Sequence, residues 1–201
     1  MKNSKTLSLA LMLLLTVTTL GSAPSSCGKN PGLNLDPAVK GPETPDLFKD
    51  APPLPQKIIN LDLGVVLAFP DDWTVSENPE NPVLFAMAPG ADLNGPLANL
   101  VVEKLTHRMN SFDYMEANTL TMKTAISGLE VKWGGVENLA GTSSAWLQFT
   151  FNRGGVKMEA LSYCQTRDYH AYVVTALAPA TQFETNEALF RAIGRSLKVH
   201  R

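Results

Sequence analysis

The feature that most constrains the fold of this chain is a series of long alternating segments in its second half. Residues 145–152 follow the two-residue period of a β-strand, so one side would carry Ala145, Leu147, Phe149 and Phe151, and the other Trp146, Gln148, Thr150 and Asn152. A tight turn at 153–155 follows, and residues 156–165 and 170–177 have the pattern of another hairpin. We therefore expect three long strands paired in antiparallel fashion.

Two segments with helical periodicity accompany these strands. Ser111 is a suitable N-cap for a helix over about 111–127, with Asp113 in its first turn. Residues 181–184, Thr-Gln-Phe-Glu, form a capping-box sequence that predicts a second helix over about 182–196. Strand-like runs precede the first helix, at residues 64–69, 73–75, 83–88 and 97–105. This order predicts an α+β fold with helices packed on a central antiparallel sheet.

The N-terminal residues have the pattern of an export signal. Lys2 and Lys5 precede a stretch without charged residues at 7–20, and small residues follow at 21–23. The stretch is shorter than the roughly 20 apolar residues of a membrane-spanning helix. We expect residues 1–26 to be a signal peptide, and an uncleaved membrane anchor is the alternative.

Cys27 is the candidate modification site. Ser25-Ser26-Cys27 resembles the end of a bacterial lipobox, in which the cysteine is acylated and becomes the new N-terminus, although Pro24 stands where leucine is usual. Several acyl chains, at about 0.8 kcal/mol per buried methylene, would anchor the protein stably to a membrane. The alternatives are an unmodified thiol or a disulfide with Cys164, the only other cysteine.

The next segment differs in composition from everything after it. Seven of the 29 residues at 28–56 are proline and no apolar period persists, which is typical of an extended, unfolded tether. We expect a tether at 27–56 and one folded domain at 57–201. The net charge of −2 and the lack of a basic stripe make nucleic acid an unsuitable partner.

Three stretches of the domain resemble the PsbP-like superfamily, which includes PsbP-like and DcrB-like domains: LGVVLAFPDDW at 63–73, GGVKMEALSYCQTRDYHAYVVTALAP at 154–179, and FETNEALFRAIGRSLKV at 183–199. The resemblance implies an α/β/α sandwich around an antiparallel sheet, closed by a helix and a short strand at 196–199. Members of this superfamily usually have no enzymatic activity, and bacterial members are often small exported lipoproteins, so the resemblance implies a non-enzymatic role.

Asp71 and Asp72, between Pro70 and Trp73, are the first candidates for acid–base chemistry. A pair of carboxylates that shares a proton must converge within a few ångström. Adjacent residues of an extended chain point to opposite sides, and proline followed by aspartates is common turn chemistry. We expect a turn here, with Trp73 in the core, and no catalytic residues.

Cys164 and His170 are the candidates for a thiol–imidazole pair. If Arg167-Asp168 is a two-residue loop, Cys164 lies opposite Ala171, and Cys164 and His170 face opposite sides of the sheet. Cys164 would then share its side with Met158, Ala160 and Val173, as an inert packed thiol does.

Histidines are few and none has metal-ligand spacing. His107, His170 and His200 are the only ones, and no two are placed as in a His-x3-His ligand pair. We therefore expect no metal site, and no phosphate-loop or nucleotide-binding pattern predicts a cofactor.

Three functions from different classes remain open. The first is a non-catalytic envelope lipoprotein, anchored in a membrane through Cys27, whose domain binds an envelope protein or wall component. The second, which the resemblance permits, is a secretion or assembly adaptor chaperone, and the third is a periplasmic hydrolase or redox protein. The sequence favours the first, with the protein facing the periplasm or cell surface. Because Gly28 stands where many lipoproteins retained at the inner membrane have aspartate, the outer membrane is slightly favoured.

Overall fold

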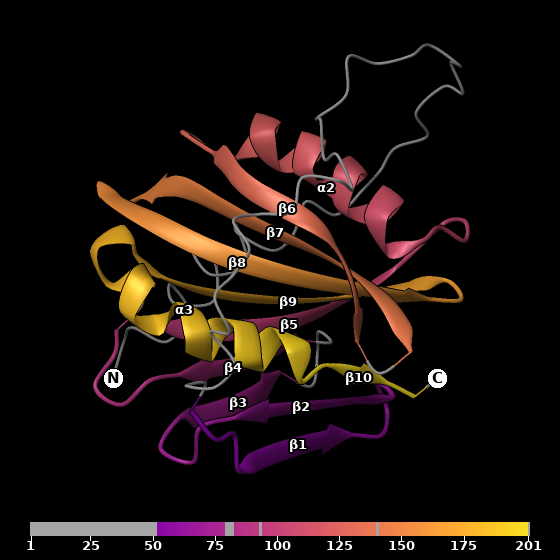
Figure 1. The fold of residues 1–201 in the computed structure, drawn as a ribbon, viewed down its shortest axis with the longest axis horizontal. Coiled ribbons are helices and arrows are strands. Elements are labelled where there is room, and N and C mark those ends of the chain that lie inside the picture. Colours follow the sequence, from indigo (N-terminus) through magenta and orange to yellow (C-terminus); the bar gives the residue numbers. More distant parts are fainter. Residues whose placement is uncertain (1–51, 79–82, 93, 140, 201) are drawn as a thin grey trace.

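A seven-stranded antiparallel sheet forms the centre of the domain (Figure 1). The computed structural model describes residues 52–78, 83–92, 94–139 and 141–200. The strand order is β3-β4-β5-β9-β8-β7-β6. The strands are β3 (Thr74–Asn78), β4 (Val83–Met87), β5 (Leu97–Lys104), β6 (Glu130–Leu139), β7 (Thr142–Arg153), β8 (Val156–Arg167) and β9 (His170–Pro179). The three long strands expected from the alternating pattern are β7, β8 and β9, which confirms that prediction.

One helix covers each face of this sheet (Figure 1). Helix α2 (Ser111–Ala125) packs mainly on β7 and β8, and helix α3 (Ala180–Arg195) packs on β8 and β9. On β8, Ala160 belongs to the core beneath α2, whereas Leu161 belongs to the core beneath α3. Side chains of a strand alternate between faces, so the helices lie on opposite sides. The predicted α+β fold is confirmed.

A smaller sheet, β1-β2-β10, completes the α3 side of the molecule. It consists of β1 (Gln56–Asn60), β2 (Val65–Phe69) and β10 (Lys198–Val199). The backbone N–H of Ala68 donates to Ser196 Oγ at 2.9 Å, which ties the end of α3 to β2. The strand pattern at 64–69 and the short closing strand were predicted, but their separation into a second sheet was not.

Both helix starts differ from the predicted caps. The N-cap of α2 is Asn110, whose side chain accepts the backbone N–H of Asp113 at 2.8 Å, while the Ser111 hydroxyl donates to Ser143 O at 3.0 Å. Asn is as good a cap as Ser, so local sequence could not separate them. Helix α3 follows β9 directly after Pro179, without a side-chain cap, so the predicted capping box at 181–184 is wrong.

The β8–β9 hairpin has a different register from the predicted one. Its loop is Asp168-Tyr169 rather than Arg167-Asp168, and Cys164 pairs with Val173 rather than Ala171. Asp168 adopts a positive φ of 53°, which aspartate tolerates better than most residues. Moving the loop by one residue shifts the pairing by two, so each side chain keeps its predicted face.

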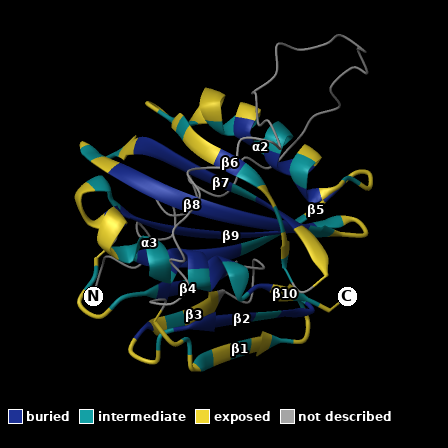
Figure 2. Ribbon diagram, in the orientation of Figure 1, coloured by how far each residue is buried: buried dark blue, intermediate teal, exposed yellow. Residues whose placement is uncertain are grey.

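Burial is greatest in the central strands and least in the edge strands (Figure 2). Nearly every residue of β8 and β9 is buried, whereas β1 and β6 at the edges alternate between buried or half-buried and exposed positions. Neither helix, within the part of the chain that the structure describes, is long and apolar enough to cross a membrane.

Candidate functional site

The aspartates that first suggested chemistry lie in an exposed turn. Asp71 and Asp72 are both exposed, and the backbone N–H of Trp73 closes the turn by donating to Pro70 O at 3.3 Å. Trp73 is buried and stacks on Phe69, with ring centroids 6.4 Å apart. The predicted turn and core tryptophan are confirmed.

Cys164 has no exposed surface and is a free thiol. Burial, followed by the nearby negative charge of Glu103, raises the pKa of this thiol well above its usual range. It packs in the same core as Met158, Ala160 and Val173, as predicted. His170 belongs to the opposite face, because its position on β9 has the other parity from Val173. The two side chains do not form a catalytic pair.

The histidines are dispersed in the structure. His107 is exposed, and its Nδ1 lies 3.1 Å from Thr106 Oγ1. His170 lies beside the Tyr172 ring. The backbone N–H of His200 donates to Gly64 O at 2.8 Å. No group of three or more metal-ligating side chains occurs among the described residues. Cys27, with the predicted signal peptide and most of the tether, lies outside these residues.

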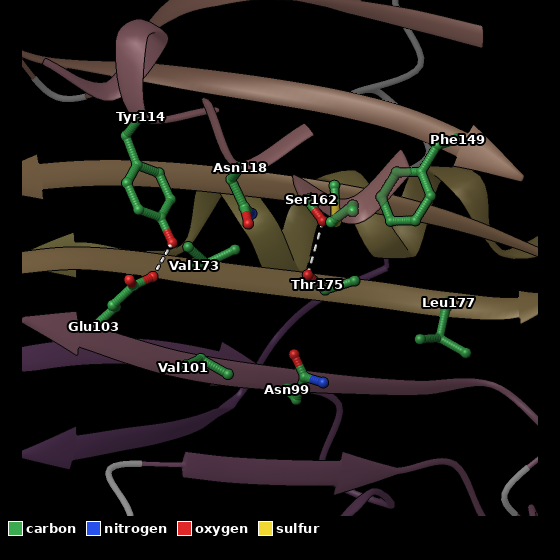
Figure 3. A pocket seen from close by; sticks show the side chains of 11 residues that line it. Asn99, Val101, Glu103, Tyr114, Asn118, Phe149, Ser162, Val173, Thr175 and Leu177 are labelled. Carbon is green, nitrogen blue, oxygen red and sulfur yellow. Dashed lines mark hydrogen bonds between the residues drawn. The ribbon is translucent and has the colours of Figure 1, made fainter. Parts of the chain in front are cut away.

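A groove runs between α2 and the strands β5 and β9 (Figure 3). It encloses a cavity of about 60 Å³. From α2, positions four residues apart form its wall, namely Tyr114, Asn118 and Met122. The other lining residues come from the sheet: Asn99, Val101, Glu103, Phe149, Ser162, Val173, Thr175 and Leu177. Helix α2 makes its main contacts with β7 and β8, so the cavity lies beside the helix, over β5 and β9.

A row of polar side chains crosses the floor of the groove. Asn99 pairs with Thr175, and Thr175 pairs with Ser162, so the three side chains are neighbours on adjacent strands. Ser162 Oγ and Thr175 Oγ1 lie 2.7 Å apart and share a hydrogen bond. Asn99 is 3% exposed, yet its Oδ1 has no hydrogen-bond partner. Such orphaned acceptors are rare because leaving one buried costs about 1–3 kcal/mol.

Glu103 carries the negative charge of the groove. Tyr114 descends from α2 and donates its hydroxyl hydrogen to Glu103 Oε2 at 2.6 Å (Figure 3). Burial first, and then this hydrogen bond, raise the pKa of Tyr114 far above its usual value, so Tyr114 remains a neutral donor. No cationic side chain among the described residues forms a salt bridge with Glu103.

A second cleft, of about 270 Å³, lies where the two sheets meet. Its lining includes Asp62, Arg167, Asp168 and His170. Arg167 donates to Val199 O at 3.1 Å, and Asp168 pairs with Arg108 at 3.2 Å. Because these charged groups already have partners, the smaller groove beneath α2 is the better candidate site.

The groove was not predicted from the sequence, although part of its signal was present. Asn99 and Glu103 interrupt an apolar strand at positions of equal parity, which places both on one face. Ser162 and Thr175 likewise stand among apolar residues near the middle of long predicted strands. Their proximity could not be inferred locally, because β5 pairs with β9, and β9 follows it only after α2 and three further strands.

No protein-family model and no curated protein matches this chain. Solved structures do match. Cyanobacterial PsbP (CyanoP) from Synechocystis sp. PCC 6803 has a TM-score of 0.55 at 12% identity, covering 72% of this chain and 91% of that chain. LpqN, involved in cell envelope biogenesis of Mycobacterium tuberculosis, has a TM-score of 0.56 at 16% identity, covering 73% and 90%.

A third structure agrees with these two. PA94 from Pseudomonas aeruginosa, described as a protein of unknown function and putative regulator, has a TM-score of 0.51 at 12% identity, covering 68% of this chain and 90% of that chain. At such low identity the likeness shows the fold alone. The described residues form an α+β domain with the PsbP-like fold, as the resemblance of the sequence implied.

Proposed function

We propose that this protein is an exported cell-envelope lipoprotein whose PsbP-like domain is a non-catalytic binding module. The observation that carries the proposal is the groove between α2 and the sheet, which holds a buried amide oxygen without a partner and a carboxylate without a counter-ion. A ligand in the groove would satisfy both groups. Polar groups of this kind cost free energy in the free domain and form stabilising hydrogen bonds only in the complex.

The absence of assembled chemistry supports a binding role over a catalytic one. Cys164 is the only thiol among the described residues, and its raised pKa keeps it protonated and unreactive. Asp71 and Asp72 stand in a solvent-exposed turn and line neither the groove nor the second cleft. A nucleophile with an adjacent base, which covalent catalysis requires, is not formed by these candidates.

The sequence supports the placement of the protein in the envelope. The basic and apolar start at residues 2–20, the lipobox-like end at Cys27 and the proline-rich segment at 28–56 together suit a lipid anchor and a tether. The likeness to LpqN, a protein of cell envelope biogenesis, fits the same compartment. Complete burial of Cys164 favours acylation of Cys27 over a disulfide between them.

The adaptor-chaperone alternative fits the groove less well. A partner's amphipathic helix needs an apolar groove, read at spacings of three and four residues. The floor beneath α2 instead carries the polar row Asn99, Thr175 and Ser162. We therefore place a small or extended polar ligand, rather than a helix, in this groove.

Two measurements test the proposal. The intact mass of the mature protein from membranes is expected to show acylated Cys27, and cleavage after Ala23 with an unmodified or oxidised Cys27 would contradict the anchor. A photo-crosslinking residue at Asn118, on the wall of the groove, is expected to capture an envelope ligand in intact cells. The same residue at the exposed Glu184 of α3 is the control. Equal capture at both positions would contradict the groove as the binding site.

A further inference from the structure

The groove beneath α2 offers several free acceptors to a ligand, beside the amide donors of Asn99 and Asn118. Tyr114 occupies only Oε2 of Glu103, so Oε1 has room for another donor. Asn99 Oδ1 has no partner at all. Thr175 and Ser162 satisfy one another through one shared hydrogen bond and keep further lone pairs. A ligand that carries hydrogen-bond donors therefore matches the groove.

The negative charge of Glu103 determines which charge the ligand should carry. Glu103 is half-buried and forms no salt bridge within the described residues. A carboxylate near a low-dielectric wall attracts a cation more strongly than one in bulk water, and repels an anion equally. A neutral donor would leave the charge uncompensated, so a cationic ligand satisfies the groove best.

Apolar side chains separate the two acceptors. Val101 lies between Asn99 and Glu103 on β5, and it pairs with Val173 on β9, so two β-branched side chains form the floor there. Phe149, Met122 and Leu177 add further apolar lining. A methylene chain fits such a surface, because long cationic side chains bury their stems on apolar atoms and keep the charged head at a polar group.

We propose that this groove binds a primary ammonium group on an unbranched aliphatic stem, with Glu103 as its anionic partner. The stem lies over Val101 and Val173, and a second donor on the ligand reaches Asn99. The inference rests on the proposed binding role of the groove and specifies its ligand. A lysine side chain of a partner protein and a free aliphatic amine both have this chemistry.

The test is an NMR titration of the purified mature protein with n-butylammonium chloride. We expect saturable shifts of backbone amides in β5, β9 and α2, which weaken as salt screens Glu103. Butyrate and n-butanol, which have the same stem without the cation, are expected to give no saturable shift. Saturable binding of butyrate or n-butanol with equal strength would overturn the proposal.

Glu103→Gln is the decisive variant because its amide oxygen can still accept from Tyr114 while the charge is gone. We expect about tenfold weaker binding or more, as for loss of a charge-assisted hydrogen bond. Glu184→Gln, on the opposite side of the molecule, is the matched control and should bind as the parent does. Unchanged binding by the Glu103 variant, with its parent-like spectrum confirming the fold, would overturn the proposal.

The two sources of the ammonium group are separated by peptides. We would compare an unstructured peptide that carries one lysine with the same peptide carrying acetyl-lysine. If the lysine peptide binds more tightly than butylammonium and the acetylated peptide does not, the source is a protein partner. Equal or weaker binding of the lysine peptide indicates a free amine. If no amine binds while a crosslinker at Asn118 still captures a specific ligand, the ammonium proposal fails and the binding role of the groove remains.

Discussion

The helices on the two faces of the central sheet pack against it with different closeness. On the α3 face, the helix packs so closely that a Cβ on Gly194 would lie 2.6 Å from Cε2 of the Tyr163 ring. On the α2 face, the helix leaves a groove over β5 and β9 with an unpartnered buried amide. The same strands β8 and β9 contribute to both faces, so the difference lies in where each helix sits.

Polar groups show the contrast most clearly. On the α3 side, Arg191 donates to Glu187 at 2.7 Å, approaches Gln148 Oε1 at 3.4 Å and lies over the Trp146 ring at 5.2 Å. Gln148 in turn donates to Glu159, which also accepts from Lys132 at 2.6 Å. These charges form a connected network. Glu103 and Asn99, on the α2 side, belong to none.

The difference indicates a division of roles between the faces. The close packing and the connected charges of the α3 face contribute stability and fix the helix. Thr150 Oγ1, Tyr163 OH and Gln165 Oε1 on that face also lack partners among the described residues, but Asn99 Oδ1 differs from them in belonging to a residue that lines a cavity. A polar group that lacks a partner costs stability and is retained where a ligand uses it. We expect substitutions on the α3 face to affect folding and substitutions in the groove to affect binding.

The largest predicted effect is a cavity on the α3 face. Phe190 has no exposed surface and packs against Phe183 at a centroid distance of 5.5 Å. Phe190→Ala should lower the free energy of unfolding by about 4 kcal/mol, measured by urea denaturation. Met122→Ala, in the wall of the groove, should cost only roughly 1 kcal/mol because Met122 already borders open space. Equal costs would contradict the distinction between the faces.

Removing a member of the charged network should have the next largest effect. Arg191→Met would leave Gln148 and Glu187 without the guanidinium, and we expect a loss of about 2 kcal/mol of unfolding free energy, since Glu187 is partly exposed. Lys157→Met is the control. Its partner Glu130 lies 4.0 Å away and both are exposed, so the change should be below about 0.5 kcal/mol.

Alkaline pH provides a test that reaches both faces. Burial raises the pKa values of Cys164 and Tyr114 on the α2 face, and raises that of Tyr163 on the α3 face to about 12. The folded protein keeps these protons after the unfolded chain has lost them. The stability that these groups contribute is therefore full below the thiol's unfolded pKa of about 8.5. Above that pH the free energy of unfolding falls by up to about 1.4 kcal/mol per pH unit for each group that ionises in the unfolded chain.

The contribution of the thiol can be separated from that of the tyrosines by mutation. Cys164→Ala should remove the loss of stability between pH 8.5 and 10, and leave the loss above pH 10, where tyrosines of the unfolded chain ionise at about 10. Urea denaturation at stepped pH measures both ranges. An unaltered slope below pH 10 in this variant would show that Cys164 is not the group responsible.

The smallest predicted effect has the opposite sign. Asn99→Leu replaces an unsatisfied buried amide with an apolar group of similar size, so it should raise the unfolding free energy by about 1 kcal/mol. The same substitution should weaken ammonium binding. Thr175→Val is the comparison, because it deprives Ser162 of its partner and should destabilise by about 1 kcal/mol. Destabilisation by Asn99→Leu would mean that the amide oxygen is satisfied in solution.

The local sequence was sufficient to predict the helices and strands that have a clear apolar period. The alternation at 145–152 and the helical periods at 111–127 and 182–196 predicted β7, α2 and α3, because burial of one face repeats along each element. The caps were not predicted, because Asn110 competes with Ser111, and Pro179 lets β9 pass directly into α3.

The groove could not be predicted in the same way. Its polar row depends on Asn99 and Ser162 both being neighbours of Thr175, which requires the pairing of β5 with β9. That Asn99 Oδ1 has no partner and that Glu103 has no salt bridge within the described part of the chain further depend on α2 lying over β7 and β8. Polar residues of equal parity in an apolar strand, such as Asn99 and Glu103, indicate a polar site on one face of the sheet.

The smaller sheet has a consequence for the order of assembly. The hydrogen bond between Ala68 and Ser196 joins residues 128 positions apart, and β2 lies between β1 and β10. Contacts of such high sequence separation close large loops and form slowly. Because β2 must wait for β10 at the far end of the domain, we expect this sheet to be completed last, after the hairpins of β7, β8 and β9 have formed.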